Sequence, residues 1–182
     1  MAQSPKLKTA SAMMAWLSLT VALAIAIAMP IGILYPVDFH HGGFHLTFQY
    51  ALPGGFAVSQ ATPFVYRMAI FGIALLPIGL TVWMLLSLFR LFRLFTQGCV
   101  FDAKAQSLIG RVASLLFAMV LAEIVTQPAI LYLLGRAVGQ LRLGYVITGD
   151  ELPNLFAAGV ILVIARVMAE ANRIAEENAK FV

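Results

Sequence analysis

The sequence predicts an all-α integral membrane protein, a bundle of four transmembrane helices with both termini in the cytoplasm. Three observations lead to this fold class: the composition, the lengths of the apolar segments and the placement of the basic residues. The chain of 182 residues is 62% hydrophobic and 11% charged, with a mean hydropathy of +0.93. A soluble domain is about 25% charged, so this chain has too few charged side chains to cover a surface in water.

Four apolar segments are candidates for crossing a bilayer, which takes about 20 residues of helix. The predicted spans cover residues 13–35, 68–88, 108–134 and 152–168, and the last of these is the shortest. The first run is too long for the apolar part of a cleaved signal peptide, so we expect it to be retained. The whole chain, 1–182, is then one membrane domain.

The basic residues predict the orientation. Cytoplasmic segments close to membrane spans carry an excess of Lys and Arg. Nine of the 12 basic residues fall in the N-terminal segment, the central loop and the C-terminal segment, which share one side of the predicted membrane. These nine are Lys6, Lys8, Arg90, Arg93, Lys104, Arg111, Arg166, Arg173 and Lys180. We therefore expect both termini inside, and the loops 36–66 and 135–151 outside.

The central segment, residues 88–111, is predicted to form a tight helix–loop–helix at the membrane surface. Gly98 fits the C′ position that ends a helix, and Asp102 fits the N-cap of the next one. The phenylalanines before Gly98 would stay in the apolar interface, while Arg90 and Arg93 would reach headgroup phosphates.

The third predicted span contains an intramembrane polar site formed by Glu123, Thr126 and Gln127. Glu123 lies about 22 Å from the inner end of this span, at about 1.5 Å per residue. A carboxylate at that depth is costly, so it should face the bundle or be protonated. Three interpretations stay open: an ion or proton site, a polar contact with a partner helix, or an interhelical hydrogen bond that fixes the packing.

The first span carries small residues at helical spacing, and we predict a helix-packing face at Ala22, Ala26 and Gly32. Small side chains let helix backbones approach closely in lipid. The face could serve packing within the bundle or contact with another protein's helix.

The first outward loop has the composition of a short strand or hairpin, because aromatic and β-branched residues lie between glycine-rich turns. His40, His41 and His45 cluster there with Asp38 and are weak candidates for a zinc site. Adjacent histidines on a strand point to opposite faces, so the prediction is that no metal binds.

The fourth span is predicted to continue as a cytoplasmic helical tail over residues 169–179. Arg166, Glu170, Arg173 and Glu177 follow one another at spacings of four, three and four, which places them on one helix face. The predicted cytoplasmic face for a soluble partner comprises Arg90, Arg93 and Arg173.

Two short motifs resemble a known family. One is a basic helix end followed by Gly98-Cys99-Val100-Phe101 and a helix start, and the other is Ala175-Glu176-Glu177-Asn178 followed by Phe181-Val182. On these residues the chain resembles the bacterial membrane family known as domain of unknown function 2975, whose members are small four-span proteins. Many members look to be encoded beside small helix-turn-helix regulators. The resemblance implies a multi-pass protein of the bacterial inner membrane with a regulatory partner, and implies no catalytic or ligand residue.

The function predicted from the sequence is non-enzymatic partner binding in the membrane, with a regulatory role. A phosphate-binding glycine loop, a dinucleotide motif, HExxH and GxSxG are all absent, so we expect neither enzyme activity nor a cofactor. The alternatives are an accessory or structural subunit of a larger membrane complex, and a small transporter or channel that uses Glu123. The expected partners are the lipid bilayer and a protein, either a membrane complex or a cytoplasmic regulator. A homo-oligomer is a further option, and no direct contact with nucleic acid is expected.

Overall fold

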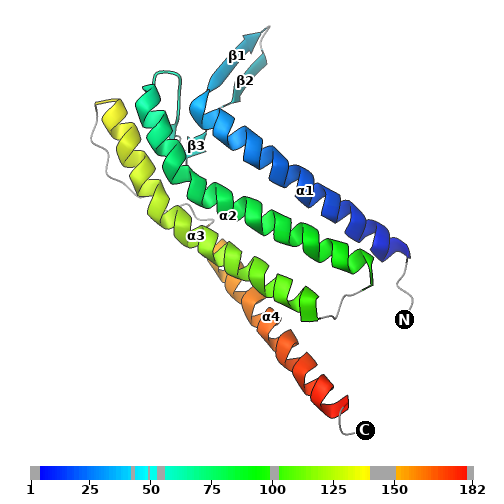
Figure 1. Ribbon diagram of the computed structural model, residues 1–182. Coiled ribbons are helices and arrows are strands. Elements are labelled where there is room, and N and C mark those ends of the chain that lie inside the picture. The colour runs from blue at the N-terminus through cyan, green and yellow to red at the C-terminus, as the bar shows by residue number, and fades with distance from the viewer. Residues whose placement is uncertain are drawn as a thin grey trace.

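Four helices make up most of the chain (Figure 1). The computed structural model describes residues 5–41, 44–48, 50–52, 56–98, 103–139 and 151–179. The helices are α1 (Pro5–Leu34), α2 (Phe64–Thr96), α3 (Ala103–Ala137) and α4 (Glu151–Ala179). α4 covers the predicted fourth span and the predicted tail as one continuous helix.

Three helices are long and apolar enough to cross a membrane: Lys8–Leu34, Phe64–Thr96 and Lys104–Ala137. Their outer surfaces expose many large apolar side chains, such as Trp16 and Val125, which suits a hydrocarbon environment. The apolar part of α4, Leu155–Met168, is shorter than these, and a span takes about 20 residues. The chain therefore has the character of a membrane protein, and a crossing by α4 stays a prediction.

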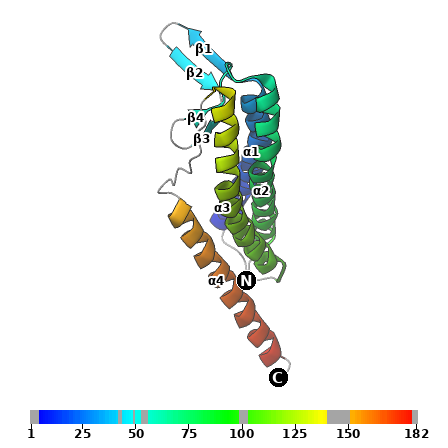
Figure 2. The same ribbon diagram turned by 90° about the vertical axis from the view of Figure 1, so that its left-hand side faces the viewer.

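The helices pack in chain order, α1 on α2, α2 on α3 and α3 on α4. Figures 1 and 2 show α1, α2 and α3 side by side. α4 begins partway along α3 and continues past the beginning of α3. Within the described residues the four helices thus form an open row, whereas the sequence predicts a bundle. The reason is that α4 packs mainly on α3, so it does not form a second layer over α1 and α2.

Small residues line the contact between α1 and α2. Ser11, Ala15, Ser18 and Ala22 are all buried, and their spacing of four, three and four places them along one stripe of the helix. The Ser18 hydroxyl donates to the Met14 carbonyl at 2.7 Å, so its donor is satisfied although the environment is apolar. Side chains this small let the two backbones approach closely, which is how helices gain packing energy in lipid.

Two of the three residues predicted for the packing face lie on this side of α1. Ala22 and Gly32 are buried, and Ala26 is exposed. The spacings along the stripe alternate between four and three, so the next residue on the stripe after Ala22 is Ile25 and not Ala26. Ala26 therefore lies on the surface of the helix row, where lipid or another protein's helix would contact it.

The main apolar core lies at the end of the helix row where α1 ends, which we call the loop end. The opposite end, where α2 ends and α3 begins, is the turn end. The core joins three helices and one loop residue. The buried members are Ile33 of α1, Val58 of the loop, Ile70 and Ala74 of α2, and Ile130, Leu131 and Leu134 of α3. Val58 is completely buried, so the connection between α1 and α2 packs against the helices at this end.

The same connection contains two short antiparallel strand pairs. Strands β1 (Val37–His41) and β2 (Phe44–Phe48) form a hairpin. Strands β3 (Ala51–Leu52) and β4 (Phe56–Ala57) form the second pair. The Val58 N–H donates to the Tyr50 carbonyl at 3.0 Å, which turns the chain back toward the core.

Arg67, in the first turns of α2, holds the loop end together. Its Nε donates to the Thr62 carbonyl at 2.8 Å and its Nη1 donates to the Leu34 carbonyl at 3.0 Å. The last carbonyls of a helix have no partner inside that helix, so Arg67 caps α1 from the neighbouring helix.

At the turn end α2 stops at the glycine predicted for this role. Gly98 has a φ of +89°, and its N–H donates to the Phe95 carbonyl at 3.1 Å. A left-handed residue after the last turn is the usual glycine stop of a helix. The predicted N-cap, Asp102, lies outside the described residues.

Candidate functional site

The predicted intramembrane polar site lies on one face of α3. Thr126 and Gln127 are buried, and Glu123 is half-buried. Residues three and four apart on a helix are neighbours, so α3 brings these three side chains together directly before Pro128.

The members of this site differ in how their polar groups are satisfied. The Thr126 hydroxyl donates to the Ala122 carbonyl at 2.8 Å. Gln127 is 8% exposed, and its Oε1 is buried without a hydrogen-bond partner in the described part of the chain. An unsatisfied buried acceptor costs about 1–3 kcal/mol. Gln127 is therefore the side chain at which a donor, such as a water or a protonated ligand, would be stabilised.

Tyr50 of the loop approaches this site from outside α3. Burial raises the pKa of its phenol above the ordinary 10.0, and the negative charge of Glu123 raises it further. Tyr50 also packs against the core at the loop end. The sequence does not indicate this position of Tyr50, because Tyr50 belongs to no periodic segment.

We expect Gln127→Met to raise the free energy of unfolding by about 1 kcal/mol, since it removes an unpaired buried acceptor and nearly keeps the volume. Thermal unfolding of the detergent-solubilised protein measures this. Thr126→Val is the control, because it removes a hydroxyl that has a partner and should lower stability. A clear loss of stability in Gln127→Met would contradict the prediction and indicate that this amide holds a bound water or ion.

A second candidate site is a groove between α2 and α3 at the turn end, with a volume of about 530 Å³. We call it the basic groove. It contains Arg90 and Arg93, two of the residues predicted for the cytoplasmic face, together with two more cations from α3. Its lining comprises Phe89, Arg90, Arg93, Leu94, Gln97, Lys104, Ser107, Leu108 and Arg111.

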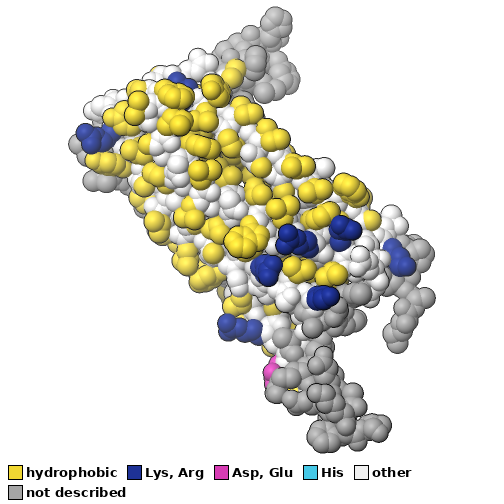
Figure 3. Space-filling view, viewed as in Figure 1, with side chains coloured by type: hydrophobic (Ala, Val, Ile, Leu, Met, Phe, Trp, Pro, Cys, Tyr) yellow, Lys and Arg dark blue, Asp and Glu magenta, His cyan; other side chains and the backbone are white. Residues whose placement is uncertain are grey.

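All four cations of the basic groove are exposed. Figure 3 shows Lys and Arg side chains gathered toward this end of the molecule, among apolar side chains. The Arg93 guanidinium lies 5.8 Å from the centre of the Phe89 ring, a distance at which cation–π attraction orients the side chain. Within the described residues none of the four has a carboxylate partner.

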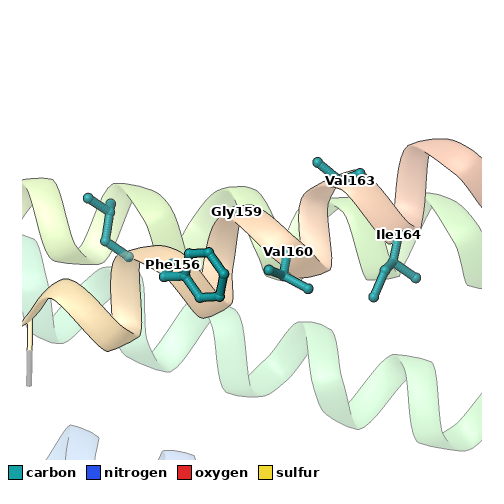
Figure 4. A pocket seen from close by; sticks show the side chains of 6 residues that line it. Phe156, Gly159, Val160, Val163 and Ile164 are labelled. Carbon is teal, nitrogen blue, oxygen red and sulfur yellow. The ribbon is translucent and has the colours of Figure 1, made fainter.

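The surface of α4 carries an apolar groove lined by Leu155, Phe156, Gly159, Val160, Val163 and Ile164 (Figure 4). α4 meets α3 through Ala158 and Ala165, which are buried. Phe156 is 74% exposed, so this large ring has lost little of its accessible surface in the described structure. Lipid or a further helix would cover the groove in a membrane.

The C-terminal part of α4 extends past the turn end (Figure 2). The Gln106 side chain donates from Nε2 to the Met168 carbonyl at 3.2 Å, which places Met168 beside the beginning of α3. The helix then runs on to Ala179, about 16 Å further at 1.5 Å per residue. Ile174 is 48% exposed there, and the Arg173 side chain lies outside the described residues.

The three histidines fall on the β1–β2 hairpin, where His40 pairs with His45 and His41 pairs with Phe44 in the strand register. Their side chains lie outside the described residues. In the part of the chain that was described, no group of three or more His, Cys, Asp or Glu side chains is placed to hold a metal ion.

No protein-family model, curated protein or solved structure matches this chain. Membership of the family known as domain of unknown function 2975 therefore stays a prediction.

Proposed function

We propose that the chain is a non-enzymatic, multi-pass protein of the bacterial inner membrane that binds a soluble regulator at its cytoplasmic face. In this proposal the turn end faces the cytoplasm, because Arg90, Arg93, Lys104 and Arg111 lie there and basic residues favour that side. α4 crosses as the fourth span, so both termini are cytoplasmic. The family resemblance supports the same arrangement.

The observation that carries this proposal is the extension of α4 beyond the rest of the helix row. The residues after Met168 project past the beginning of α3 (Figure 1). Glu170 and Ile174 are exposed on this extension, which gives it both charged and apolar surface. An amphipathic helix of this kind fits an apolar groove of a partner protein.

Deleting residues 169–182 should release the soluble partner while the membrane domain stays folded. Affinity purification in mild detergent followed by mass spectrometry compares the full chain with the truncated one. Ile174→Gln should weaken capture in the same direction, because it removes the exposed apolar anchor. Arg136→Gln, an exposed cation at the loop end, is the control that should change nothing. Unchanged capture of soluble proteins by the truncated chain would contradict the proposal.

A second candidate function is an accessory subunit of a larger membrane complex, which the apolar groove on α4 favours. The same purification separates the two functions through Gly159→Leu. A Cβ added at Gly159 has no other atom within 4 Å, so the leucine should fill the groove without disturbing α3. The subunit function predicts that this variant loses membrane partners, whereas the regulatory function predicts that the soluble partner is retained.

A further inference from the structure

We propose that the basic groove is a binding site for an anionic phospholipid, with the lipid phosphate held between α2 and α3. The inference rests on the crossing of the membrane by these two helices. It does not depend on the soluble regulator proposed above, and the two can fail separately.

The charge of the groove favours an anionic ligand. Arg90 and Arg93 come from α2, and Lys104 and Arg111 come from α3. Lys104 and Arg111 are seven residues apart, about two helical turns, and so lie on one face of α3. Four cations without a carboxylate partner in the described residues repel one another, and a bound anion relieves that repulsion. Arg is also suited to phosphate, because its planar guanidinium can donate two parallel hydrogen bonds.

The apolar part of the lining favours a lipid over a free ion. Phe89, Leu94 and Leu108 share the groove with the cations, and Figure 3 shows basic and apolar side chains interspersed on this face. A free phosphate ion gains nothing from apolar side chains. A phospholipid does, because its headgroup meets the cations while its acyl chains continue along the apolar surfaces of α2 and α3. Basic pockets between transmembrane helices are known to hold anionic headgroups.

Membrane topology alone does not account for the groove. The excess of basic residues in cytoplasmic segments orients a chain through their number and their closeness to the spans. It sets no requirement that cations from two helices line one groove. Gln97 and Ser107 add neutral polar groups to the same lining, and the Ser107 hydroxyl already donates to the Lys104 carbonyl at 2.9 Å.

The test measures lipid binding by the full-length protein in detergent, by native mass spectrometry with phosphatidylglycerol and phosphatidylcholine added in turn. We expect tighter binding of phosphatidylglycerol. Each cation near an anionic lipid surface contributes enough to change affinity about fivefold, so Arg93→Gln with Arg111→Gln should weaken that binding about 25-fold. Phosphatidylcholine binding should not change. Arg136→Gln, the same substitution on an exposed arginine at the loop end, should leave both lipids unaffected.

Three results would overturn the inference. Equal binding of the two lipids by the unmodified protein would show that the groove has no anion preference. Displacement of phosphatidylglycerol by millimolar inorganic phosphate would identify a site for the free ion. If the double variant binds lipid as before but no longer captures an acidic soluble protein, the groove is a protein-docking surface. The four side chains are exposed, and an unchanged thermal midpoint confirms that the variants are folded.

Discussion

Ala22→Leu is expected to separate α1 from α2 and to lower the free energy of unfolding by about 2–3 kcal/mol. Ala22 is 1% exposed and lies on the stripe of small residues through which α1 packs. A leucine side chain adds three carbon atoms where the helix backbones approach closely, so α1 must shift or rotate. Denaturant unfolding of the detergent-solubilised protein measures the loss.

Ala26→Leu is the matched control, since it makes the same change one turn further along α1 at an exposed position. Its effect on stability should lie within about 0.5 kcal/mol. Equal destabilisation by both substitutions would contradict the packing face described for α1. If Ala26→Leu leaves stability unchanged but releases a membrane partner, the exposed side of α1 is a protein interface.

Arg67→Gln is expected to cost about 3 kcal/mol, because hydrogen bonds from a charged group contribute about 1.5–3 kcal/mol each. The variant loses the bonds to the carbonyls of Leu34 and Thr62, and the end of α1 is left without its cap. Hydrogen exchange should show the largest increase in the last turn of α1.

Two variants make the Arg67 prediction sharper. Arg67→Lys keeps the charge but not the planar fork, so it should recover only part of the lost stability. Arg136→Gln removes an exposed cation from the same end of the molecule and should have little effect. If Arg67→Gln unfolds like the unmodified protein, the contact with Leu34 does not hold α1 in place.

The long helices could be predicted from the sequence, because a run of about 20 apolar residues in lipid satisfies its backbone groups only as a helix or a closed barrel. The sequence also indicates the end of α2 at Gly98, since glycine readily adopts the left-handed conformation that follows the last turn of a helix. The stripe at Ser11, Ala15 and Ser18 was not predictable. α1 is apolar on all sides, so no periodicity distinguishes the side facing α2 from the side facing lipid.

The candidate sites could be predicted only in part, for a similar reason. Glu123, Thr126 and Gln127 stand out as polar residues in an apolar run. Tyr50 and Arg67 do not, because their roles depend on how the connection between α1 and α2 folds back onto the helices. The basic groove needs the relative rotation of α2 and α3, and only the structure supplies it.

Packing in chain order has a consequence for biosynthesis. Each helix finds its main partner in the helix made just before it, so the row can assemble from the N-terminus while the ribosome is still working. Sequence-local contacts of this kind are associated with fast folding. The core around Val58 is the exception, because Ile130 and Leu131 of α3 complete it. A nascent chain that ends after α2 should hold a formed α1–α2 pair whose connection closes only when α3 arrives.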